Sequence, residues 1–275
     1  MNAYGAAEVD DPGVNDSEVN DAEVLVEVRE HIGWITLNRP DRMNAVNVAL
    51  ARALGAALTG LGQRTDVHAV IIRGSGGNFC AGGDFDEVQR LRADGPEALR
   101  TLFTTFKEAC DVIAGLPVPV VAAVDGVAMA GGFELMQAAD IVLVCEQARI
   151  ADNHVNFGMI PGGGSTARLP RILGRQQALG LLLSGDKFSG IEAVRIGLAY
   201  RAFAPEVFHD SVQAFAARLA GRDRSALTAI KELVVAGLDT DLATANRHET
   251  DAVVARLSGS AGQAGVSAFK NRETT

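Results

Sequence analysis

An apolar, β-branched run that ends near a pair of glycines constrains this chain more than any other feature. Residues 118–124 read VPVVAAV, which is typical of a buried strand. The turn Asp125-Gly126 follows, and a short apolar step leads to Gly131 and Gly132. Glu134 comes two residues later, inside an apolar segment with helical character. The stretch therefore predicts a strand, a glycine turn and the start of a helix.

This predicted helix start has two interpretations. The first N–H groups of a helix lack partners and carry the positive end of the helix dipole, and glycines let a ligand approach them closely. With Glu134 as a proton-transfer group, the arrangement is half of an active site. The alternative is a buried turn in which Glu134 is only a cap. The stretch alone leaves both interpretations open.

Around this stretch, strands and helices alternate up to residue 204, and the pattern is helical afterwards. We therefore expect an α/β fold with a mainly parallel sheet, a core over 23–204 and a helical C-terminal region over 205–275. Residues 1–22 are acidic and contain no Lys or Arg, so we expect a disordered tail. The predicted elements are a hairpin at 23–38, helices at 46–61 and 96–115, strands at 67–73 and 140–145, a loop at 150–164, a capped helix from Ser189 to Gly197 and a helix from Pro205.

Composition narrows the classes of function. The net charge of −9 argues against broad binding to nucleic acid or to anionic membranes. The three cysteines form no CxxC pair, and an odd number fits no closed disulfide framework, so we expect reduced thiols and a cytoplasmic location. We see no secretory signal and no apolar run of membrane-spanning length.

A second glycine-rich turn, FCAGGD at 79–84, also follows a buried strand. If its backbone amides converge with those of AGGFE at 130–134, they form an oxyanion hole for an enolate or a tetrahedral intermediate. Neither turn matches GxxxxGK[ST] or GxGxxG, so a nucleotide phosphate loop is not indicated.

Five ordered motifs together resemble the enoyl-CoA hydratase/isomerase, or crotonase, superfamily. Each motif alone is weakly specific, but the ordered set, extending over about residues 24–272, is highly specific. The motifs are NRPDRMNAV (38–46), GNFCAGGDFDEV (77–88), PVVAAVDGVAMAGGFELMQAAD (119–140), FGMIPGGGSTARLPRILG (157–174) and SGDKFSGIEAVRIGLAYR (184–201).

The resemblance implies a crotonase-like spiral of ββα units whose helical C-terminal region makes trimers, which often pair into hexamers. It implies an acyl-CoA substrate, an enolate-like intermediate, and no metal or cofactor beyond the coenzyme A of the substrate. The family's residues then fall as follows: oxyanion donors on the N–H groups of Gly83 and Gly131, a catalytic carboxylate on Glu134, and substrate contacts on Ala81, Phe269 and Arg272.

The chain departs from the hydratase pattern at the second catalytic carboxylate. Counted from Glu134 without gaps, that position is His154. Histidine titrates near pH 6.5, so His154 is a candidate acid/base, and Asp152 is a candidate either to orient it or to replace it. The alternative is that His154 only packs in the pocket wall. A His–Asp metal site lacks a suggested third ligand.

Other polar residues have structural interpretations. Asp84 is expected to cap the oxyanion loop, and Asp86 and Glu87 to lie at a solvated helix start. Cys80 and Cys145 are expected in the core. The remaining histidines show no partner pattern and receive no role: His31, His68, His209 and His248.

Three hypotheses follow. The first is hydration of a 2-enoyl-CoA, or the reverse, by Glu134 and His154. The second keeps the oxyanion hole but replaces the reaction with isomerisation, hydrolysis or C–C cleavage, because His154 stands where a carboxylate is expected. The third is a non-catalytic relative that binds acyl-CoA or RNA; the acidic composition and the retained Glu134 argue against it.

Overall fold

The main sheet carries the loops that form the candidate site. In the computed structural model, which describes residues 22–259, this sheet has six strands in the order β1-β2-β3-β4-β6-β9. β1 and β2 form an antiparallel hairpin and every later neighbour is parallel, so the predicted hairpin and mainly parallel sheet are confirmed. The strands are β1 (Val24–Arg29), β2 (Ile32–Leu37), β3 (Ala69–Gly74), β4 (Val120–Val124), β6 (Ile141–Cys145) and β9 (Arg201–Phe203).

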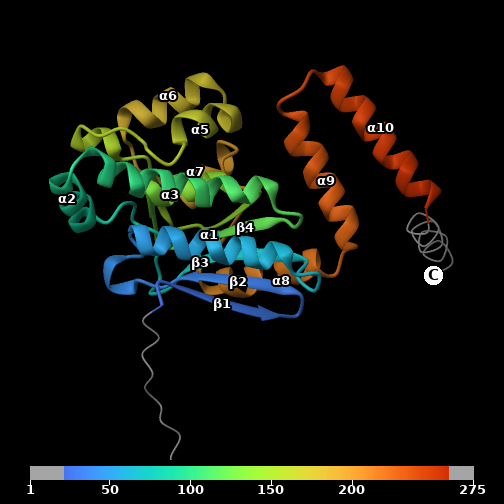
Figure 1. The fold of residues 1–275 in the computed structure, drawn as a ribbon, viewed down its shortest axis with the longest axis horizontal. Helices are drawn as coiled ribbons and strands as arrows, with labels where there is room; N and C mark the ends of the chain where they lie inside the picture. The colour runs from blue at the N-terminus through green and yellow to red at the C-terminus, as the bar shows by residue number, and fades with distance from the viewer. Residues whose placement is uncertain (1–21, 260–275) are drawn as a thin grey trace, which may run out of the picture.

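β4 lies at the centre of this sheet, and all of its residues are buried. α1 (Val48–Gln63) and α3 (Pro96–Gly115) pack side by side over one face of the sheet, and α8 (Phe208–Ala220) covers the other (Figure 1). Leu54, Phe106 and Val212 belong to the apolar faces predicted for these helices and are all buried. Covering both faces explains why the strand sequence is apolar throughout rather than alternating.

A smaller, three-stranded sheet stands beside the main one. It contains β5 (Val127–Met129), β7 (Arg149–Ala151) and β8 (Phe188–Ser189). β5 follows β4 after a two-residue turn and pairs in parallel with β7, with Met129 opposite Ala151. The chain therefore moves from the main sheet to the small sheet immediately before α4 (Gly131–Ala138).

The predicted loop at 150–164 contains more structure than its sequence suggests. Its first residues complete β7, and His154–Phe157 form the 3-10 turn η2 before the chain reaches α5 (Ser165–Leu173). These short elements have too few residues to produce a readable periodicity. The remaining elements are α2 (Phe85–Asp94), α6 (Arg175–Ser184), α7 (Gly190–Arg195) and the 3-10 turns η1 (Pro40–Arg42) and η3 (Pro205–Val207).

Local signals at helix ends are confirmed where the sequence carried them. Ser189 and Glu192 form the predicted capping box of α7. Pro96 lies in the first turn of α3, and Asp84 caps α2 by accepting a hydrogen bond from the Glu87 amide. Asp86 is exposed and pairs with Arg42 (2.8 Å), as expected for a solvated helix start.

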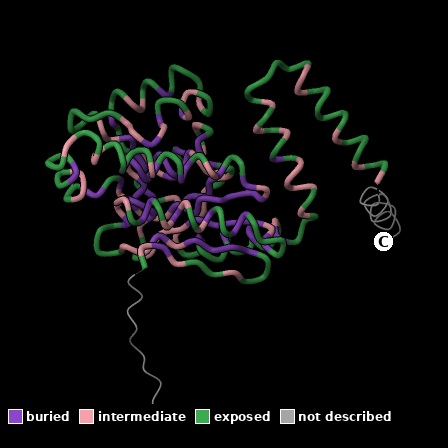
Figure 2. Tube along the Cα trace, in the orientation of Figure 1, coloured by how far each residue is buried: buried purple, intermediate pink, exposed green. Residues whose placement is uncertain are grey.

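After α8 the chain forms an arm of two helices, α9 (Arg224–Gly237) and α10 (Leu242–Ser258), that extends away from the body (Figure 1). Most of this arm is exposed (Figure 2). Lys231 on α9 is an exception: it is buried, donates to the carbonyl of Ile113 (2.7 Å) and pairs with Asp140 (2.7 Å). This contact fixes α9 to the ends of α3 and β6.

Parts of the sequence prediction lie beyond this description. The tail predicted at 1–22 falls outside the described residues except for its last position. Phe269 and Arg272 lie outside them as well. The domain boundary at 204/205 stays a prediction, although α8, which follows it, packs on the main sheet. In the part of the chain that is described, no helix is long and apolar enough to cross a membrane.

Candidate active site

The two glycine turns lie against each other. The amide of Cys80 donates to the carbonyl of Val127 (2.9 Å), and the amide of Met129 donates to the carbonyl of Cys80 (3.0 Å). A Cβ on Gly132 would lie only 2.0 Å from the carbonyl oxygen of Cys80, so glycine is required for this approach. The pairing sets the loop at 79–84 beside the first turn of α4.

This arrangement brings the amides of Gly83 and Gly131 into one small volume. A Cβ built on Gly131 would lie 3.6 Å from the nitrogen of Gly83. Among residues 22–259, neither N–H has a hydrogen-bond acceptor. Ala130, just before α4, has a φ of 48°, a conformation uncommon for alanine and frequent at functional turns. Two unpaired amides at a helix start can stabilise a developing negative charge.

Glu134 lies in the first turn of α4 and is only 2% exposed. Its Oε1 accepts hydrogen bonds from the amides of Gly163 (2.7 Å) and Ser165 (3.1 Å). Burial raises the pKa of Glu134 above its usual value, and the two amides together with nearby His154 only partly oppose this effect. The carboxyl is therefore held by two hydrogen bonds and is a stronger base than an exposed glutamate.

The glycine run at 162–164 forms the cover over Glu134. A Cβ on Gly163 would lie 2.5 Å from the ring of Phe106 and 3.0 Å from Oε2 of Glu134. Any larger residue would push α3 or the carboxylate out of place. The absence of side chains lets the loop come close enough for its amides to bind Glu134.

Asp152 and His154 form a second polar group, placed by the pairing of β5 with β7. Nδ1 of His154 lies 2.6 Å from Oδ1 of Asp152, and the Asp152 side chain is almost fully buried. Burial alone lowers the pKa of His154, but the hydrogen bond and charge of Asp152, with the charge of Glu134, outweigh it and raise the pKa above its usual value. Each of His154 and Glu134 therefore acts on the titration of the other.

The structure thus brings together five of the predicted residues: Gly83, Gly131, Glu134, Asp152 and His154. Ala81 lies on the same loop as Gly83 and donates its amide to the carbonyl of Met43 (2.9 Å). Asp84 pairs with Arg39 (2.8 Å) and caps α2, which agrees with a structural role. In the described residues, no group of three or more His, Cys, Asp and Glu side chains is arranged to hold a metal ion.

Sequence reasoning missed Asn44, which helps to fix the loop at 79–84. Asn44 is fully buried, and its amide donates to the carbonyls of Ser75 (2.9 Å) and Asn78 (2.7 Å). Its Oδ1 accepts from the amide of Arg39 (2.9 Å). Asn44 therefore ties the turn at 39–46 to the root of the loop that carries Gly83. Asn44 has a φ of 57°, and asparagine is one of the residue types that tolerate this conformation in turns. The sequence can therefore suggest a turn here, but it does not show which carbonyls the Asn44 side chain reaches.

Comparisons with known proteins point in one direction. The model of the enoyl-CoA hydratase/isomerase family matches residues 27–275. The chain is 35% identical over 251 residues to a probable enoyl-CoA hydratase of Rhodobacter capsulatus, covering 90% of this chain and 94% of that protein. It is 33% identical over 230 residues to a crotonyl-CoA hydratase of Syntrophomonas wolfei, covering 83% and 87%. A crystal structure of an enoyl-CoA hydratase from Bacillus anthracis superposes with a TM-score of 0.86 at 29% identity, covering 91% of this chain and 96% of that one.

Proposed function

Because the chain belongs to the enoyl-CoA hydratase/isomerase family, we propose that it adds water reversibly to the double bond of a 2-enoyl-CoA thioester. The observation that carries this proposal is Glu134, buried in the first turn of α4 beside two amides without acceptors. The proton-transfer group and the Gly131 amide are thus within one turn of helix, and the loop at 79–84 brings the Gly83 amide beside that turn. The reaction needs both at once.

The amides of Gly83 and Gly131 are proposed to hold the thioester oxygen. When water attacks the β-carbon, the electrons of the double bond move toward this oxygen and form an enolate. Donors fixed in advance stabilise that charge at little cost of reorganisation. Ala81, on the same loop, is proposed to contact the substrate near this oxygen.

Glu134 and His154 are proposed to divide the proton transfers. Glu134, held by two amides, takes a proton from the attacking water, whose oxygen bonds to the β-carbon. His154 delivers a proton to the α-carbon. Burial lowers the pKa of His154, but the hydrogen bond and charge of Asp152 outweigh this effect and raise it. The net reaction adds one water. A raised pKa makes the Glu134 carboxylate a stronger base and keeps the His154 imidazolium protonated to higher pH, which suits this division.

An absorbance assay tests the proposal directly. Hydration removes the conjugated double bond, so the purified protein should reduce the absorbance of 2-enoyl-CoA substrates at some chain length. Binding of the CoA esters without any absorbance loss would contradict hydration. Mass spectrometry of the products then separates the alternatives: gain of one water, free CoA, a fragment, or an unchanged mass for isomerisation.

We further propose that the arm of α9 and α10 joins copies of this chain into a trimer or a hexamer. Support comes from large apolar side chains that are at least 60% exposed along the arm: Ile230, Val234, Leu238 and Leu242. Such a surface is typical of an interface. Val234→Asp should shift the mass measured by light scattering toward the monomer, while Glu232→Gln should leave it unchanged. An unchanged mass in both variants would contradict this assembly.

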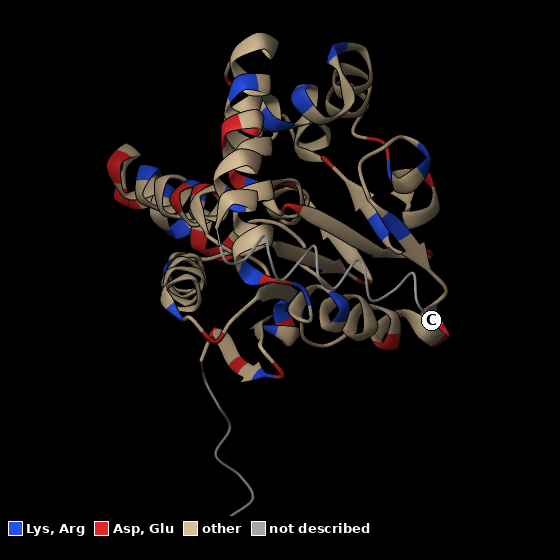
Figure 3. Ribbon diagram, turned by 90° about the vertical axis from the view of Figure 1, so that its right-hand side faces the viewer, with Lys and Arg blue, Asp and Glu red and all other residues tan. Residues whose placement is uncertain are grey.

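The chemistry proposed here uses no metal and no cofactor beyond the coenzyme A of the substrate, so prolonged dialysis against a chelator should leave the rate unchanged. A cytoplasmic location is supported by three buried cysteines without disulfides, and cell fractionation tests it. On the side seen in Figure 3, acidic and basic residues are interspersed rather than separated by sign, which supports an enzyme rather than an RNA-binding relative.

A further inference from the structure

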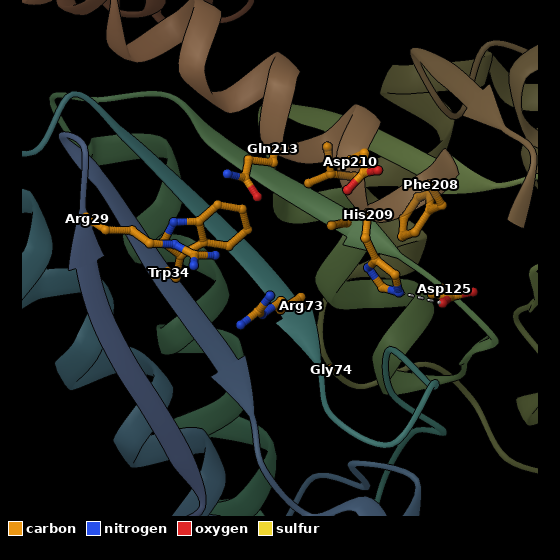
Figure 4. A pocket seen from close by; sticks show the side chains of 11 residues that line it. Arg29, Trp34, Arg73, Gly74, Asp125, Phe208, His209, Asp210 and Gln213 are labelled. Atoms are coloured by element: carbon orange, nitrogen blue, oxygen red, sulfur yellow. Dashed lines mark ion pairs between the residues drawn. The ribbon is translucent and has the colours of Figure 1, made fainter. Parts of the chain in front are cut away.

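A hollow of about 70 Å³ lies between the main sheet and the start of α8, on the sheet face away from α1 and α3 (Figure 4). It is separate from the site around Glu134. Its volume exceeds the roughly 10–15 Å³ that a single water molecule needs. The residues that line it are Arg29, Trp34, Arg73, Gly74, Ala123, Asp125, Phe208, His209, Asp210, Val212 and Gln213.

Two arginines lie over the same indole ring at this hollow. The guanidinium of Arg29 lies 4.7 Å and that of Arg73 5.1 Å from the ring centroid of Trp34. Among the residues described, Arg73 has no carboxylate in ion-pair range; its Nε donates to the hydroxyl of Thr36 (3.0 Å). Burial, and then the charge of Arg29, lower the pKa of Arg73. The carboxylate of Glu27, which pairs with Arg29 at 3.8 Å, opposes this effect only in part, so one acidic group faces two guanidinium groups.

Trp34 adds an unused donor. The residue is 3% exposed, and within residues 22–259 its Nε1 has no hydrogen-bond partner. Buried N–H groups are nearly always paired, so a buried orphan donor next to two cations requires an explanation. An acceptor that carries negative charge would satisfy the donor and both guanidinium groups.

The acidic residues of the hollow stand apart from the arginine pair. Asp125 faces His209, with 3.6 Å between the carboxylate and Nε2. Figure 4 shows this pair at the opposite end of the hollow from Arg29. Asp210 belongs to the first turn of α8, where the positive end of the helix dipole offsets its charge. With two guanidinium groups and the single carboxylate of Glu27, which lies opposite Trp34 on β1, the end next to Trp34 keeps a net positive charge.

We propose that this end of the hollow binds a phosphate group between Arg29 and Arg73. Guanidinium groups match the geometry of phosphate oxygens and can donate two parallel hydrogen bonds each. The ligand is inorganic phosphate or the phosphoryl group of a larger metabolite. Because Gly74 leads into the loop of Gly83, and Asp125 leads through β5 to Gly131, an occupied hollow lies at the roots of both oxyanion turns.

Trp34 makes this site directly observable, because it is the only tryptophan of the chain. Titration of the full-length protein with inorganic phosphate should change its fluorescence to saturation. Arg73→Gln and Arg29→Gln should each weaken binding about tenfold, since each removes a charged hydrogen bond. Arg100→Gln, at an exposed arginine on α3, is the matched control and should bind like the wild type.

The phosphate titration contains no enoyl-CoA, so its result does not depend on whether the protein is a hydratase. An absence of saturable change, wild-type affinity in both arginine variants, or displacement of phosphate by excess CoA would overturn the proposal. If Arg73→Gln does not fold, Arg29→Gln decides, because that side chain is 42% exposed. Tighter binding of glycerol phosphate than of inorganic phosphate would identify a metabolite as the ligand; the reverse would identify the free ion.

Discussion

Glu134 and His154 lie close enough to act on each other's charge but are held in place by different means. Glu134 accepts hydrogen bonds from two backbone amides, those of Gly163 and Ser165. His154 lies in the 3-10 turn η2, and its ring is held by one side chain, Asp152, at 2.6 Å. The first arrangement belongs to the fold, whereas the second depends on a single residue.

This difference predicts how each group responds to mutation. Replacements other than proline leave both backbone N–H donors in place, so the position of Glu134 is disturbed mainly by steric change in the covering loop. The orientation of His154 should change with Asp152, and its charge with Asp152 and, to a smaller extent, with Glu134. The position of the proposed base, Glu134, should therefore withstand most substitutions around it. The orientation and pKa of the proposed acid, His154, should change when Asp152 is replaced.

Glu134→Gln should have the largest effect. The amide oxygen of Gln can still accept from Gly163 and Ser165, so position is kept while the basic group is lost. We expect kcat to fall by about 10²–10⁴, the usual contribution of a general acid or base. Steady-state kinetics with a 2-enoyl-CoA measures it, with the exposed Glu108→Gln as the control. A decrease in affinity without a decrease in kcat would contradict a role in proton transfer.

His154→Asn should reduce kcat by about 10², at the lower end of the same range. Asn keeps a polar side chain near Asp152 but cannot carry a proton to the α-carbon. His31→Asn is a matched control at an exposed histidine whose φ of 64° asparagine tolerates. If His154→Asn turns over like the wild type, His154 is part of the pocket wall and a different acid operates.

Gly163→Ala tests the means by which Glu134 is held. Its Cβ would meet the ring of Phe106 at 2.5 Å and Oε2 of Glu134 at 3.0 Å. We expect a loss of about 1–3 kcal/mol in the free energy of unfolding from overpacking, and a decrease of about tenfold in kcat as the carboxylate shifts. Gly180→Ala, where a Cβ meets nothing within 4 Å, is the control. If Gly163→Ala matches Gly180→Ala in thermal unfolding and in kinetics, the covering loop can move to accommodate the added methyl group without displacing Glu134.

The sequence predicts those parts of this site whose residues lie close together in the chain, and not those formed by residues far apart. Gly131 and Glu134 are found in one motif, because a strand, a turn and a helix start are local structures. Asp152 and His154 are two residues apart and could be suspected as a pair. The bonds from Gly163 and Ser165 to Glu134 join residues 29 and 31 positions apart, through a loop without periodicity, and no local pattern encodes them.

The same reasoning applies to the fold. Apolar patterns predict α1, α3 and α8 and the strands β1, β2, β3, β4 and β6 of the main sheet, but not the three-residue β9. They do not predict η2, which is only one turn long, or the contacts of Asn44 with residues more than 30 positions away. The hollow at Trp34 forms only when α8 covers the sheet, so its arginines resemble ordinary surface charges in the sequence. Elements follow from local chemistry, whereas positioning contacts follow from the way the elements pack.

Asp152→Asn should reduce the rate by only about tenfold, no more than Gly163→Ala does, with a change in pH dependence as its signature. Asp152 raises the pKa of His154 by a hydrogen bond and by its charge. If the His154 imidazolium is the acid, activity declines as pH rises through that pKa. Removing the carboxylate lowers the pKa, so the alkaline decline of kcat should move to lower pH. Asp86→Asn, at an exposed aspartate, should keep the wild-type profile.

The stability of the same variant has a defined sign. A histidine whose pKa is raised by folding stabilises the protein fully below its unfolded pKa, near 6.5, and this contribution is lost as pH rises through the folded value. The difference in unfolding free energy between wild type and Asp152→Asn should be about 1.5–3 kcal/mol near pH 5.5, as for other charged hydrogen bonds, and should shrink above the raised pKa. Urea unfolding of both proteins at pH 5.5 and at a pH above the raised pKa of His154 measures this difference. A difference independent of pH would mean that Asp152 holds His154 by shape rather than by charge, and the contrast with Glu134 would then concern packing alone.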